Sequence, residues 1–248
     1  MSYTAVTALS HSGLVRDHNE DSLVIGPWTL CGTVTETPQT LVFPRTRPLL
    51  TAVADGLGGQ PGGEIASGLV ANRLAEFGPT LTDAEGVGTA LETCNRQLFE
   101  AGEAHPELAT MGTTVAGVLI LPDGLLVFNI GDSRVYLHDD DGLRQISVDD
   151  SPPPAPGQRT TSRVTRTIGG TLSHTPVTAH LVPCPLGSGD RLLVCSDGLT
   201  DPVPDEIIDD LLAEEPDDGP AAFILWREAI QAGGPDNITI ALIRVDDS

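Results

Sequence analysis

The sequence predicts an α+β fold in which antiparallel sheets are covered by pairs of helices. Two observations favour this class: segments with a strand pattern outnumber segments with helix periodicity, and the helical segments come in two sequential pairs. The chain has 248 residues, 40% of them hydrophobic, which is enough for a proper core. Because we find no internal repeat and no break in composition, we expect a single domain over residues 1–248.

The first part of the chain predicts three strands. Residues 4–10 alternate weakly between apolar and polar side chains, and residues 23–25 form a short apolar run. Residues 26–48 are rich in Thr and Pro, with few apolar side chains, and predict an irregular connection. Residues 49–54 (LLTAVA) predict a buried strand.

The first helix pair follows this strand. Apolar side chains lie roughly along one helical face over residues 64–77, which predicts a helix. Thr82 with Glu85 forms a capping box that begins a second helix, in which apolar side chains follow at spacings of three and four. We expect both helices to face the core. The side chains expected there are Ile65, Leu69 and Leu74 in the first helix and Ala84, Val87, Leu91, Cys94 and Leu98 in the second.

The middle of the chain predicts a meander of antiparallel strands joined by short turns. Two of the turns are Asp-Gly pairs, at residues 123–124 and 141–142, a pair typical of two-residue hairpin connections. The strands are predicted over residues 112–121, 125–130, 134–138 and 143–146.

The last part of the chain predicts an exposed loop, the second helix pair and three strands. The loop is residues 151–157 (SPPPAPG), whose prolines exclude regular structure. One helix opens at Pro204, and the other covers residues 221–232. The strands are predicted over residues 177–182, 191–195 and 238–245.

The charge and the basic residues narrow the classes of function. A formal charge of −22 disfavours binding to nucleic acid or to an anionic membrane. Most of this excess is interpreted as a solvated acidic surface, and a smaller part as carboxylates that await divalent cations. All 13 basic residues are arginine, which excludes chemistry that needs a lysine amine and leaves arginine to hold any anion.

The apolar segments and the cysteines bear on location. No segment approaches the ~20 apolar residues of a membrane span, and the first residues lack the basic and apolar regions of a signal peptide. The four cysteines form no CxxC pair and no zinc spacing, so we expect them to be reduced and structural. These observations favour a cytoplasmic location, and we expect the chain to act as a monomer.

Three apolar runs end on an aspartate, and these aspartates are candidates for chemistry. The runs lead into Asp55, Asp132 and Asp197. A carboxylate at the end of a dry strand needs a cation or several hydrogen-bond donors, because burying it unpaired costs several kcal/mol. The alternative is that Asp55-Gly56 and Asp197-Gly198 are hairpin turns. A predicted helix, instead of a returning strand, follows both pairs, which keeps a shared metal site open.

A second candidate region is residues 16–21, in which one arginine precedes two acids. Arg16 lies four and five residues before Glu20 and Asp21. This pattern is typical of a surface ion-pair cluster, which contributes less than ~1 kcal/mol. It also fits a guanidinium that binds phosphate beside carboxylates that bind metal. We expect His18 to be a surface or hydrogen-bonding histidine.

Six short motifs contain these candidates and follow one another in a particular order. The motifs are residues 16–21 (RDHNED), 55–59 (DGLGG), 111–114 (MGTT), 131–134 (GDSR), 196–199 (SDGL) and 234–238 (GPDNI). Each motif alone is weak evidence. Their order and spacing resemble those of the metal-dependent protein phosphatases of the type 2C class, in their bacterial form. The resemblance implies a four-layer α-β-β-α sandwich of two antiparallel sheets flanked by helix pairs, with metals in a cleft at one end.

The resemblance also implies roles for individual residues. Asp55 would bridge two metal ions, Gly56 would lend its backbone carbonyl, and Arg16 would hold the phosphate. The other implied ligands are Glu20, Asp21, Asp197 and Asp236 at these two ions, with Glu20 and Asp21 acting directly or through water, and Asp132 with Asp197 at a third, weaker metal. All-oxygen shells favour Mg²⁺ or Mn²⁺ over zinc. Two such ions activate a bridging water, so no protein nucleophile is required.

Two features of the chain depart from the family pattern. Leu57 occupies the place where many eukaryotic members have a histidine proposed to protonate the leaving group, so no general acid is identified. The segment between Asp132 and Asp197, which in the family carries a flap that touches substrate, is short and lacks an obvious helix. Its arginines are open to two readings, contact with a phosphopeptide or a structural role. These arginines are Arg159, Arg163 and Arg166.

The leading hypothesis is therefore a protein phosphatase that hydrolyses phosphoserine and phosphothreonine, with substrates that a Ser/Thr kinase has modified. One alternative is a pseudophosphatase that binds phosphoproteins without turnover. Another is a cation-binding sandwich whose aspartates serve stability alone, in which case Arg16 would be dispensable for any ligand.

Overall fold

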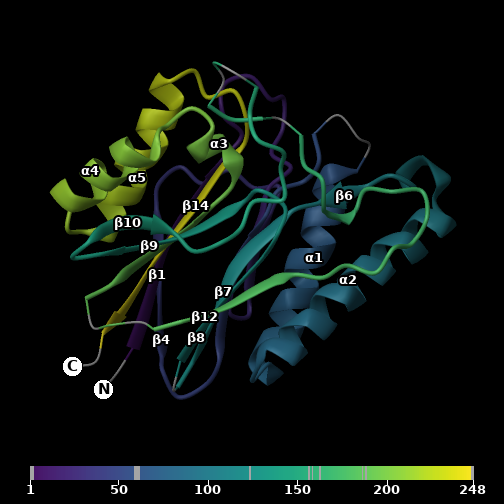
Figure 1. Cartoon of the computed structure of the whole chain (residues 1–248), viewed down its shortest axis with the longest axis horizontal. Coiled ribbons are helices and arrows are strands. Elements are labelled where there is room, and N and C mark those ends of the chain that lie inside the picture. The colour runs from purple at the N-terminus through teal and green to yellow at the C-terminus, as the bar shows by residue number, and fades with distance from the viewer. Residues whose placement is uncertain are drawn as a thin grey trace.

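The chain folds into four layers, in the order helix pair, sheet, sheet, helix pair (Figure 1). The two large sheets are antiparallel, so the expected α+β sandwich is confirmed. The computed structural model describes residues 3–58, 62–122, 124–155, 157, 159–161, 163–185, 187 and 189–246.

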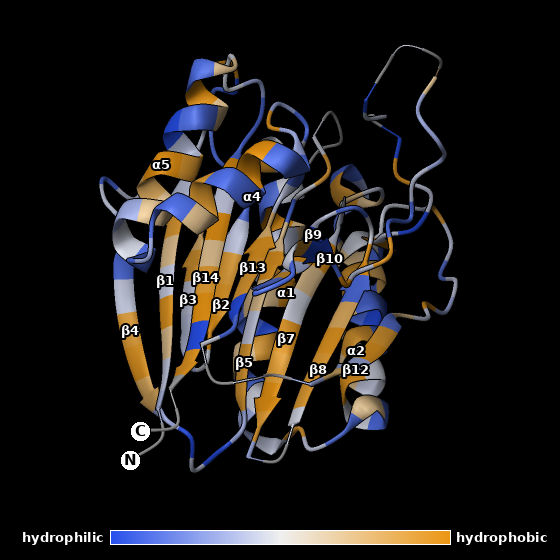
Figure 2. Cartoon of the chain, turned by 60° about the vertical axis from the view of Figure 1, so that its left-hand side comes forward, coloured by the Kyte–Doolittle hydropathy of each residue, from blue (hydrophilic) through white to orange (hydrophobic). Residues whose placement is uncertain are grey.

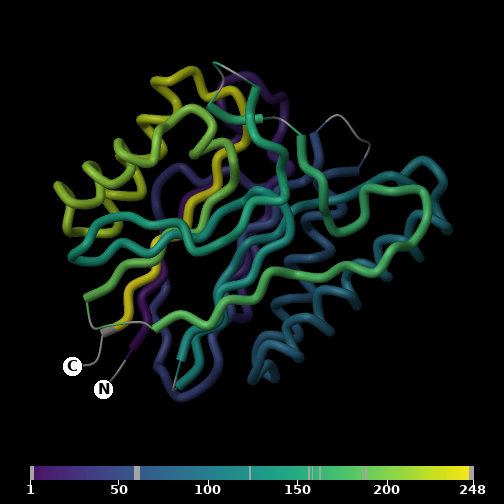
Figure 3. The backbone as a smooth tube through the Cα atoms, in the orientation of Figure 1, coloured from purple at the N-terminus to yellow at the C-terminus, as the bar shows by residue number. Residues whose placement is uncertain are grey.

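The first sheet joins the two ends of the described chain. Its strand order is β10-β9-β13-β14-β1-β4. β1 and β14 pair from Tyr3 opposite Asp246 to His11 opposite Ile238. The purple and yellow ends of the tube therefore lie side by side (Figure 3). The strands are β10 (Gly142–Gln145), β9 (Arg134–Asp139), β13 (Arg191–Cys195), β14 (Ile238–Asp246), β1 (Tyr3–His11) and β4 (Gln39–Pro44).

The second sheet packs face to face against the first. Its strand order is β12-β8-β7-β5-β2-β3. A separate ladder pairs β6 (Gly112–Thr113) with β11 (Ile168–Gly169). The strands of the second sheet are β12 (His180–Cys184), β8 (Gly124–Ile130), β7 (Val115–Leu121), β5 (Leu49–Ala54), β2 (Ser22–Ile25) and β3 (Trp28–Cys31).

One helix pair covers the outer face of each sheet. α1 and α2 pack on the second sheet, and α4 and α5 pack on the first. Figure 2 shows hydrophilic bands on the helices and mainly hydrophobic strands. The helices are α1 (Gly63–Phe77), η1 (Gly78–Thr80), α2 (Ala84–Ala104), η2 (Pro106–Leu108), α3 (Asp197–Thr200), α4 (Asp205–Glu214) and α5 (Asp218–Gln231).

The strand β5 is buried on both faces, as predicted. Its residues Leu50 and Ala52 pack toward α1 and α2, whereas Leu49 and Val53 pack toward the first sheet. Fully burying a Leu or Val side chain contributes roughly 1.5–3 kcal/mol. β5 is thus held firmly at the point where it delivers Asp55.

The irregular connection predicted over residues 26–48 is wrong, because this stretch contains β3 and β4. Both are edge strands, each at the outer side of one sheet. An edge strand covers less of the core, and Trp28 and Val42 are each 62% exposed. Such strands therefore give no continuous apolar run in the sequence.

The predicted meander is also wrong. β7 pairs with β8, and β9 pairs with β10, but β8 and β9 belong to different sheets. The chain crosses between the sheets at residues 131–133, where Gly131 has a φ of 104°. This is a conformation that favours glycine. Asp132 lies on the crossing.

Several element ends differ from the prediction. The N-cap of α2 is Asp83, which accepts a hydrogen bond from the Gly86 N–H at 2.8 Å, and not Thr82. Ile65 is 43% exposed, so α1 presents smaller residues to the core. β12 begins at His180, and the strand expected over residues 112–121 is divided at Thr114.

The two Asp-Gly turns have different outcomes. The turn at residues 141–142 connects β9 to β10, as predicted. Asp123 of the other predicted turn lies outside the described residues.

The cysteines and the helices agree with the expectations drawn from composition. The four cysteines are free thiols, and three of them are buried. Within the described ranges, none of the helices combines the length and the apolar character that crossing a bilayer requires.

Candidate metal centre

The first sheet brings five predicted residues to one edge. β1 ends where β14 begins, since His11 lies opposite Ile238, and β13 ends beside the same point, since Cys195 lies opposite Ile240. The segments that follow β1 and β13 and the segment that precedes β14 therefore meet. They carry Arg16, Glu20, Asp21, Asp197 and Asp236.

The second sheet delivers two more aspartates. β5 and β8 both pair with β7 in antiparallel register, so they run in the same direction and end at the same edge. Asp55 follows β5, and Asp132 follows β8 after Gly131. Neither Asp55 nor Asp197 forms a hairpin turn, because α1 follows the first and α3 begins at the second.

The carboxylates from the two sheets are close enough to interact electrostatically. Burial raises the pKa of the Asp55 carboxyl well above its ordinary value, and the charges of Asp197, Asp21 and Asp236 raise it further. Burial likewise raises the pKa of Asp197, with a further contribution from Asp132. Such mutual effects require neighbouring charges of the same sign. The sequence motifs therefore converge in space.

Asp21 is the most deeply buried of these acids, with a residue exposure of 1%. Its Oδ2 accepts hydrogen bonds from Ser196 Oγ at 2.8 Å and Thr239 Oγ1 at 2.6 Å. Burial raises the pKa of Asp21 to about 6, although these two hydrogen bonds lower it. Ser196 and Thr239 thus hold one carboxylate oxygen and leave the other for a different partner.

Two carboxylate oxygens are buried without a hydrogen bond from any described residue. They are Oδ1 of Asp21 and Oδ1 of Asp197. An orphaned acceptor of this kind is costly unless a cation compensates it. Carboxylate and carbonyl oxygens are the ligands that Mg²⁺ and Mn²⁺ prefer. The residues present therefore fit divalent metal ions of this class.

Gly56 lies where its backbone is closely enclosed. It forms an isolated bridge with Thr113, and a Cβ atom at this position would be 2.5 Å from the carbonyl oxygen of Gly63 and 2.8 Å from that of Glu20. Only glycine fits between these backbones. Asp55 is fixed by the same region, because its carbonyl accepts hydrogen bonds from Thr114 N at 2.9 Å and Thr113 Oγ1 at 2.7 Å.

Glu20 lies at the side of the centre, close to His18 and Glu64, a grouping that the sequence did not predict. Its backbone N–H donates to Asn237 Oδ1 at 2.8 Å, and its Oε1 lies 3.2 Å from His18 Nε2. Ligand atoms of His18, Glu20 and Glu64 lie within 4.8 Å of one another. Burial raises the pKa of Glu20, and His18 opposes this effect. His18 is exposed and hydrogen-bonded, as predicted.

Arg16 lies between Asp236, which precedes a strand of the first sheet, and Gly58, which follows a strand of the second. Its Nη2 donates to Asp236 Oδ2 at 2.5 Å. The guanidinium also lies against Gly58, where a Cβ atom would be 2.6 Å from Nη1. The side chain is 40% exposed, which leaves the guanidinium accessible to an anion.

The segment after β10 closes one side of the centre. It contains no helix among its described residues, in agreement with the sequence. Arg159 Nη2 donates to the Asp201 carbonyl at 2.9 Å, and Arg166 Nη1 donates to the Thr178 carbonyl at 3.0 Å. A cavity of about 70 Å³ lies beneath this segment. Its lining includes Asp132, Asp197, Asp201, Pro152, Pro154 and Arg159.

Sequence reasoning missed the polar residues that hold the acids in place. Each is a single Ser, Thr or Asn within or beside a strand, and such residues give no periodic signal. The position of four of them inside the recognised motifs, with Thr239 directly after the last motif, is the one indication available. The residues are Thr113, Thr114, Ser196, Asn237 and Thr239.

Comparisons with known proteins show the family of the chain. A family model described as Protein phosphatase 2C matches residues 40–228. The serine/threonine protein phosphatase PstP of Mycobacterium tuberculosis is 34% identical over 259 residues, which cover 97% of this chain and 45% of that protein. The serine/threonine phosphatase stp of Listeria welshimeri is 29% identical over 250 residues, which cover 93% of this chain and 92% of that protein. The chain thus spans less than half the length of PstP.

Solved structures share the fold. The catalytic domain of the serine/threonine protein phosphatase PstP, crystallised with two manganese ions, superposes with a TM-score of 0.78 at 32% identity, covering 100% of both chains. The S. agalactiae serine/threonine phosphatase superposes with a TM-score of 0.80 at 26% identity, covering 98% of this chain and 100% of that chain. Since the family model covers most of the sequence, the chain belongs to the protein phosphatase 2C family.

Proposed function

We propose that the chain is a metal-dependent protein phosphatase that hydrolyses phosphoserine and phosphothreonine in proteins. The observation that carries this proposal is the convergence of acids from both sheets, with two buried carboxylate oxygens that no described residue satisfies. Family membership and the relatives named as serine/threonine phosphatases support it.

The proposed metal ligands are the acids that meet at the rim of the sandwich. Two Mn²⁺ or Mg²⁺ ions would be held by Glu20, Asp21, Asp55, the Gly56 carbonyl, Asp197 and Asp236, and a third, weaker ion by Asp132 with Asp197. When bound, such ions stabilise negative charge on the phosphoryl group and provide a nucleophile from water at neutral pH. The structure with two manganese ions in a relative supports this set.

Other residues of the chain are proposed to bind the phosphate or to orient the metal ligands. Arg16 is proposed to hold the phosphate, because its accessible guanidinium lies beside the acids and its planar fork suits phosphate oxygens. Ser196 and Thr239 orient Asp21 through their hydroxyl groups. Thr113 and Thr114 fix the backbone of Asp55. These contacts prearrange the acids before substrate arrives.

The experiment that tests the proposal is Mn²⁺-dependent hydrolysis of p-nitrophenyl phosphate. We expect Asp55→Asn and Asp197→Asn each to lower kcat by about 10²-fold or more, since charge stabilisation is the largest contribution to such reactions. Asp210→Asn, which changes an exposed aspartate of α4, serves as the matched control and should keep full activity. Undiminished turnover in both site variants would reject the proposal.

The two alternatives make different predictions. A pseudophosphatase would bind a phosphopeptide in calorimetry without metal and without hydrolysis, but every predicted ligand position carries its acid, and no comparison supports this reading. A purely structural cation site would leave phosphate-ester hydrolysis unchanged in Arg16→Ala.

Partners, location and domain extent are part of the proposal. The relatives' names support phosphorylated proteins as substrates, and a Ser/Thr kinase would generate them. The charge of −22 disfavours nucleic acid and anionic membranes as partners. A cytoplasmic location and a monomeric state remain predictions. The pairing of β1 with β14 favours one phosphatase domain over residues 1–248.

A further inference from the structure

A buried carboxylate outside the proposed ligand set lies close to the crossing between the sheets. Asp150 is 7% exposed and follows β10 in an irregular segment. Burying a charged group is unfavourable unless several partners compensate it. The partners of Asp150 come from three separate segments of the chain, which indicates what this residue holds together.

The first partner is Gly131, the residue directly before Asp132. The Gly131 N–H donates to Asp150 Oδ2 at 3.0 Å, and the Asp150 N–H donates to the Gly131 carbonyl at 2.9 Å. Asp150 therefore holds both the N–H and the carbonyl of Gly131, and Asn129 Nδ2 also donates to this carbonyl, at 3.3 Å. Gly131 has a φ of 104° and packs against Thr114, since a Cβ atom added at Gly131 would lie 2.6 Å from the threonine Cβ.

The other partners are cationic or polar groups from the segment that closes the centre. His180 Nε2 lies 2.9 Å from Asp150 Oδ1, and Arg166 Nη1 lies 3.5 Å from the same oxygen. Thr165 donates to the Asp150 carbonyl through its N–H at 2.7 Å and its hydroxyl at 2.8 Å. Asp150 thus connects the sheet crossing to residues 165–180.

Asp149, the acid before Asp150, contacts the other side of Asp132 in the sequence. Asp149 accepts hydrogen bonds from Arg134, at 2.7 Å from Nη2 and 3.0 Å from Nε. Asp149 and Asp150 therefore hold the two ends of the segment 131–134, with Asp132 between them. Asp132 is 8% exposed and lines the 70 Å³ cavity together with Asp197. Asp150 thus fixes the backbone directly before Asp132, whereas Asp149 holds the side chain of Arg134 after it.

We propose that Asp150 is a positioning residue that holds Asp132 in place for the third metal ion and links it to the segment 165–180. The inference rests on the proposed metal centre. Residues that orient metal ligands from outside the coordination shell typically contribute 10- to 100-fold in affinity. Loss of Asp150 should therefore lower the affinity for the third ion and leave the affinities for the two ions at Asp55 unchanged.

The test is Mn²⁺ binding, measured as bound ions per chain by equilibrium dialysis with metal analysis. Wild-type protein is expected to bind two ions tightly and a third weakly, and Asp132→Asn identifies the third. Asp150→Ala should weaken the third ion by about 10- to 100-fold and leave the other two within about threefold. Asp150→Asn, which keeps an acceptor for the Gly131 N–H, should retain most of the third-ion affinity.

A matched control removes a similar contact at the other end of the sandwich. Asp190 Oδ2 accepts a hydrogen bond from the Gly187 N–H at 2.6 Å, in the turn before β13. Asp190→Ala should leave all three affinities unchanged. If Asp150→Ala fails to fold by circular dichroism, Asp150→Ser leaves a smaller void and should show the same selective loss.

The outcomes separate this inference from the proposed function. Wild-type protein that binds no Mn²⁺ would overturn the metal centre and the inference with it. Three ions with unchanged affinities in Asp150→Ala would overturn the inference alone. An equal weakening of all three ions with a lowered melting temperature would also overturn it, because Asp150 would then serve the fold in general.

Discussion

At the scale of single residues, the centre is a group of acids that the fold forces together against repulsion and desolvation. Burial raises the pKa of both Asp21 and Asp132 from 3.8 to about 6, and it raises the pKa values of Asp55 and Asp197 well above their ordinary value. The metal-free protein therefore retains protons that its unfolded chain would release. Metal ions and protons compete for the same oxygens.

This competition predicts how stability depends on pH and metal. For these acids the pKa in the folded state exceeds the pKa in the unfolded state, so the folded state binds more protons above about pH 4. Their contribution to the stability of the fold therefore falls as the pH rises from about 4 through 6. Added Mn²⁺ should raise the melting temperature more at about pH 7.5 than at about pH 5.5. Calorimetry with and without Mn²⁺ measures this difference. A larger metal effect at the lower pH would contradict it.

Arg16 allows a prediction about substrate binding. A charge-assisted hydrogen bond contributes about 1.5–3 kcal/mol, so Arg16→Ala should lower kcat/KM for p-nitrophenyl phosphate by about 10- to 100-fold. Mn²⁺ affinity should be measured beside it, because Arg16 also pairs with the proposed ligand Asp236 and a change in metal binding must be separated from a loss of substrate binding. The exposed Arg47 provides the control, and Arg47→Ala should match the wild type. Equal activity of the two variants would indicate that Arg16 forms only a surface ion pair and does not bind phosphate.

The sequence predicted the acids better than it predicted their supports. Asp55 and Asp197 could be found because each ends an apolar run, and this pattern has a physical cause. Thr114, Ser196 and Thr239 could not, because a lone hydroxyl in or beside a strand is compatible with many environments. Their role follows only from distances that depend on the whole fold.

At the scale of elements, the fully buried strands were predictable, whereas two of the edge strands, β3 and β4, were not. β5 and β13 are buried at every residue, so their sequences are continuous apolar runs. β3 and β4 have one free edge and mixed exposure, which leaves no clear pattern. The meander failed for another reason: a short connection does not reveal whether the chain returns to the same sheet.

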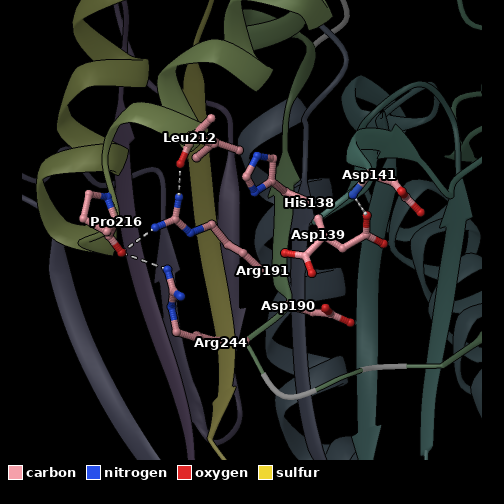
Figure 4. A pocket seen from close by; sticks show the side chains of 11 residues that line it. His138, Asp139, Asp141, Asp190, Arg191, Leu212, Pro216 and Arg244 are labelled. Atoms are coloured by element: carbon pink, nitrogen blue, oxygen red, sulfur yellow. Dashed lines mark hydrogen bonds between the residues drawn. The ribbon is translucent and has the colours of Figure 1, made fainter.

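A cavity of about 360 Å³ lies at the other end of the first sheet, and the buried Arg191 is one of its lining residues (Figure 4). Arg191, which is 3% exposed, donates to the carbonyls of Leu212 at 2.9 Å and Pro216 at 2.7 Å, and its Nε lies 2.8 Å from Asp218. Arg244 also donates to the Pro216 carbonyl, at 2.9 Å. The guanidinium therefore satisfies the carbonyls at the end of α4.

Arg191→Met should destabilise the protein strongly, because it leaves the Leu212 carbonyl without its donor and removes one of the two arginines that pair with Asp218. Breaking a buried ion pair in this way costs about 3–5 kcal/mol. Urea denaturation followed by circular dichroism measures the change. Arg144→Met, at an exposed arginine paired with Asp139, should cost less than about 1 kcal/mol. A similar cost for both variants would show that Arg191 has no special role.

The segment 151–167 combines two kinds of arginine. Arg159 and Arg166 donate to backbone carbonyls, which favours the structural reading for both. The Arg163 guanidinium makes no hydrogen bond or ion pair with the residues that the structure describes. The phosphopeptide reading is therefore open for Arg163 alone.

At the scale of the whole molecule, the centre requires both sheets and both ends of the chain. Asp236 precedes the last strand, Arg16 follows the first, and Asp55 comes from the other sheet. Local patterns cannot predict such pairing, because β1 and β14 are separated by most of the sequence. The order of the motifs supplied this information through resemblance, and β1 and β14 pair in the structure.

The measurement that tests the central claim most directly is a crystal structure of the protein grown with Mn²⁺, with the ions located by anomalous scattering. The expected result is two strong peaks bridged by Asp55, with Asp197 and Asp236 at one of them, and a weaker peak between Asp132 and Asp197. Ions bound elsewhere, or no ion at these aspartates at saturating Mn²⁺, would contradict the account.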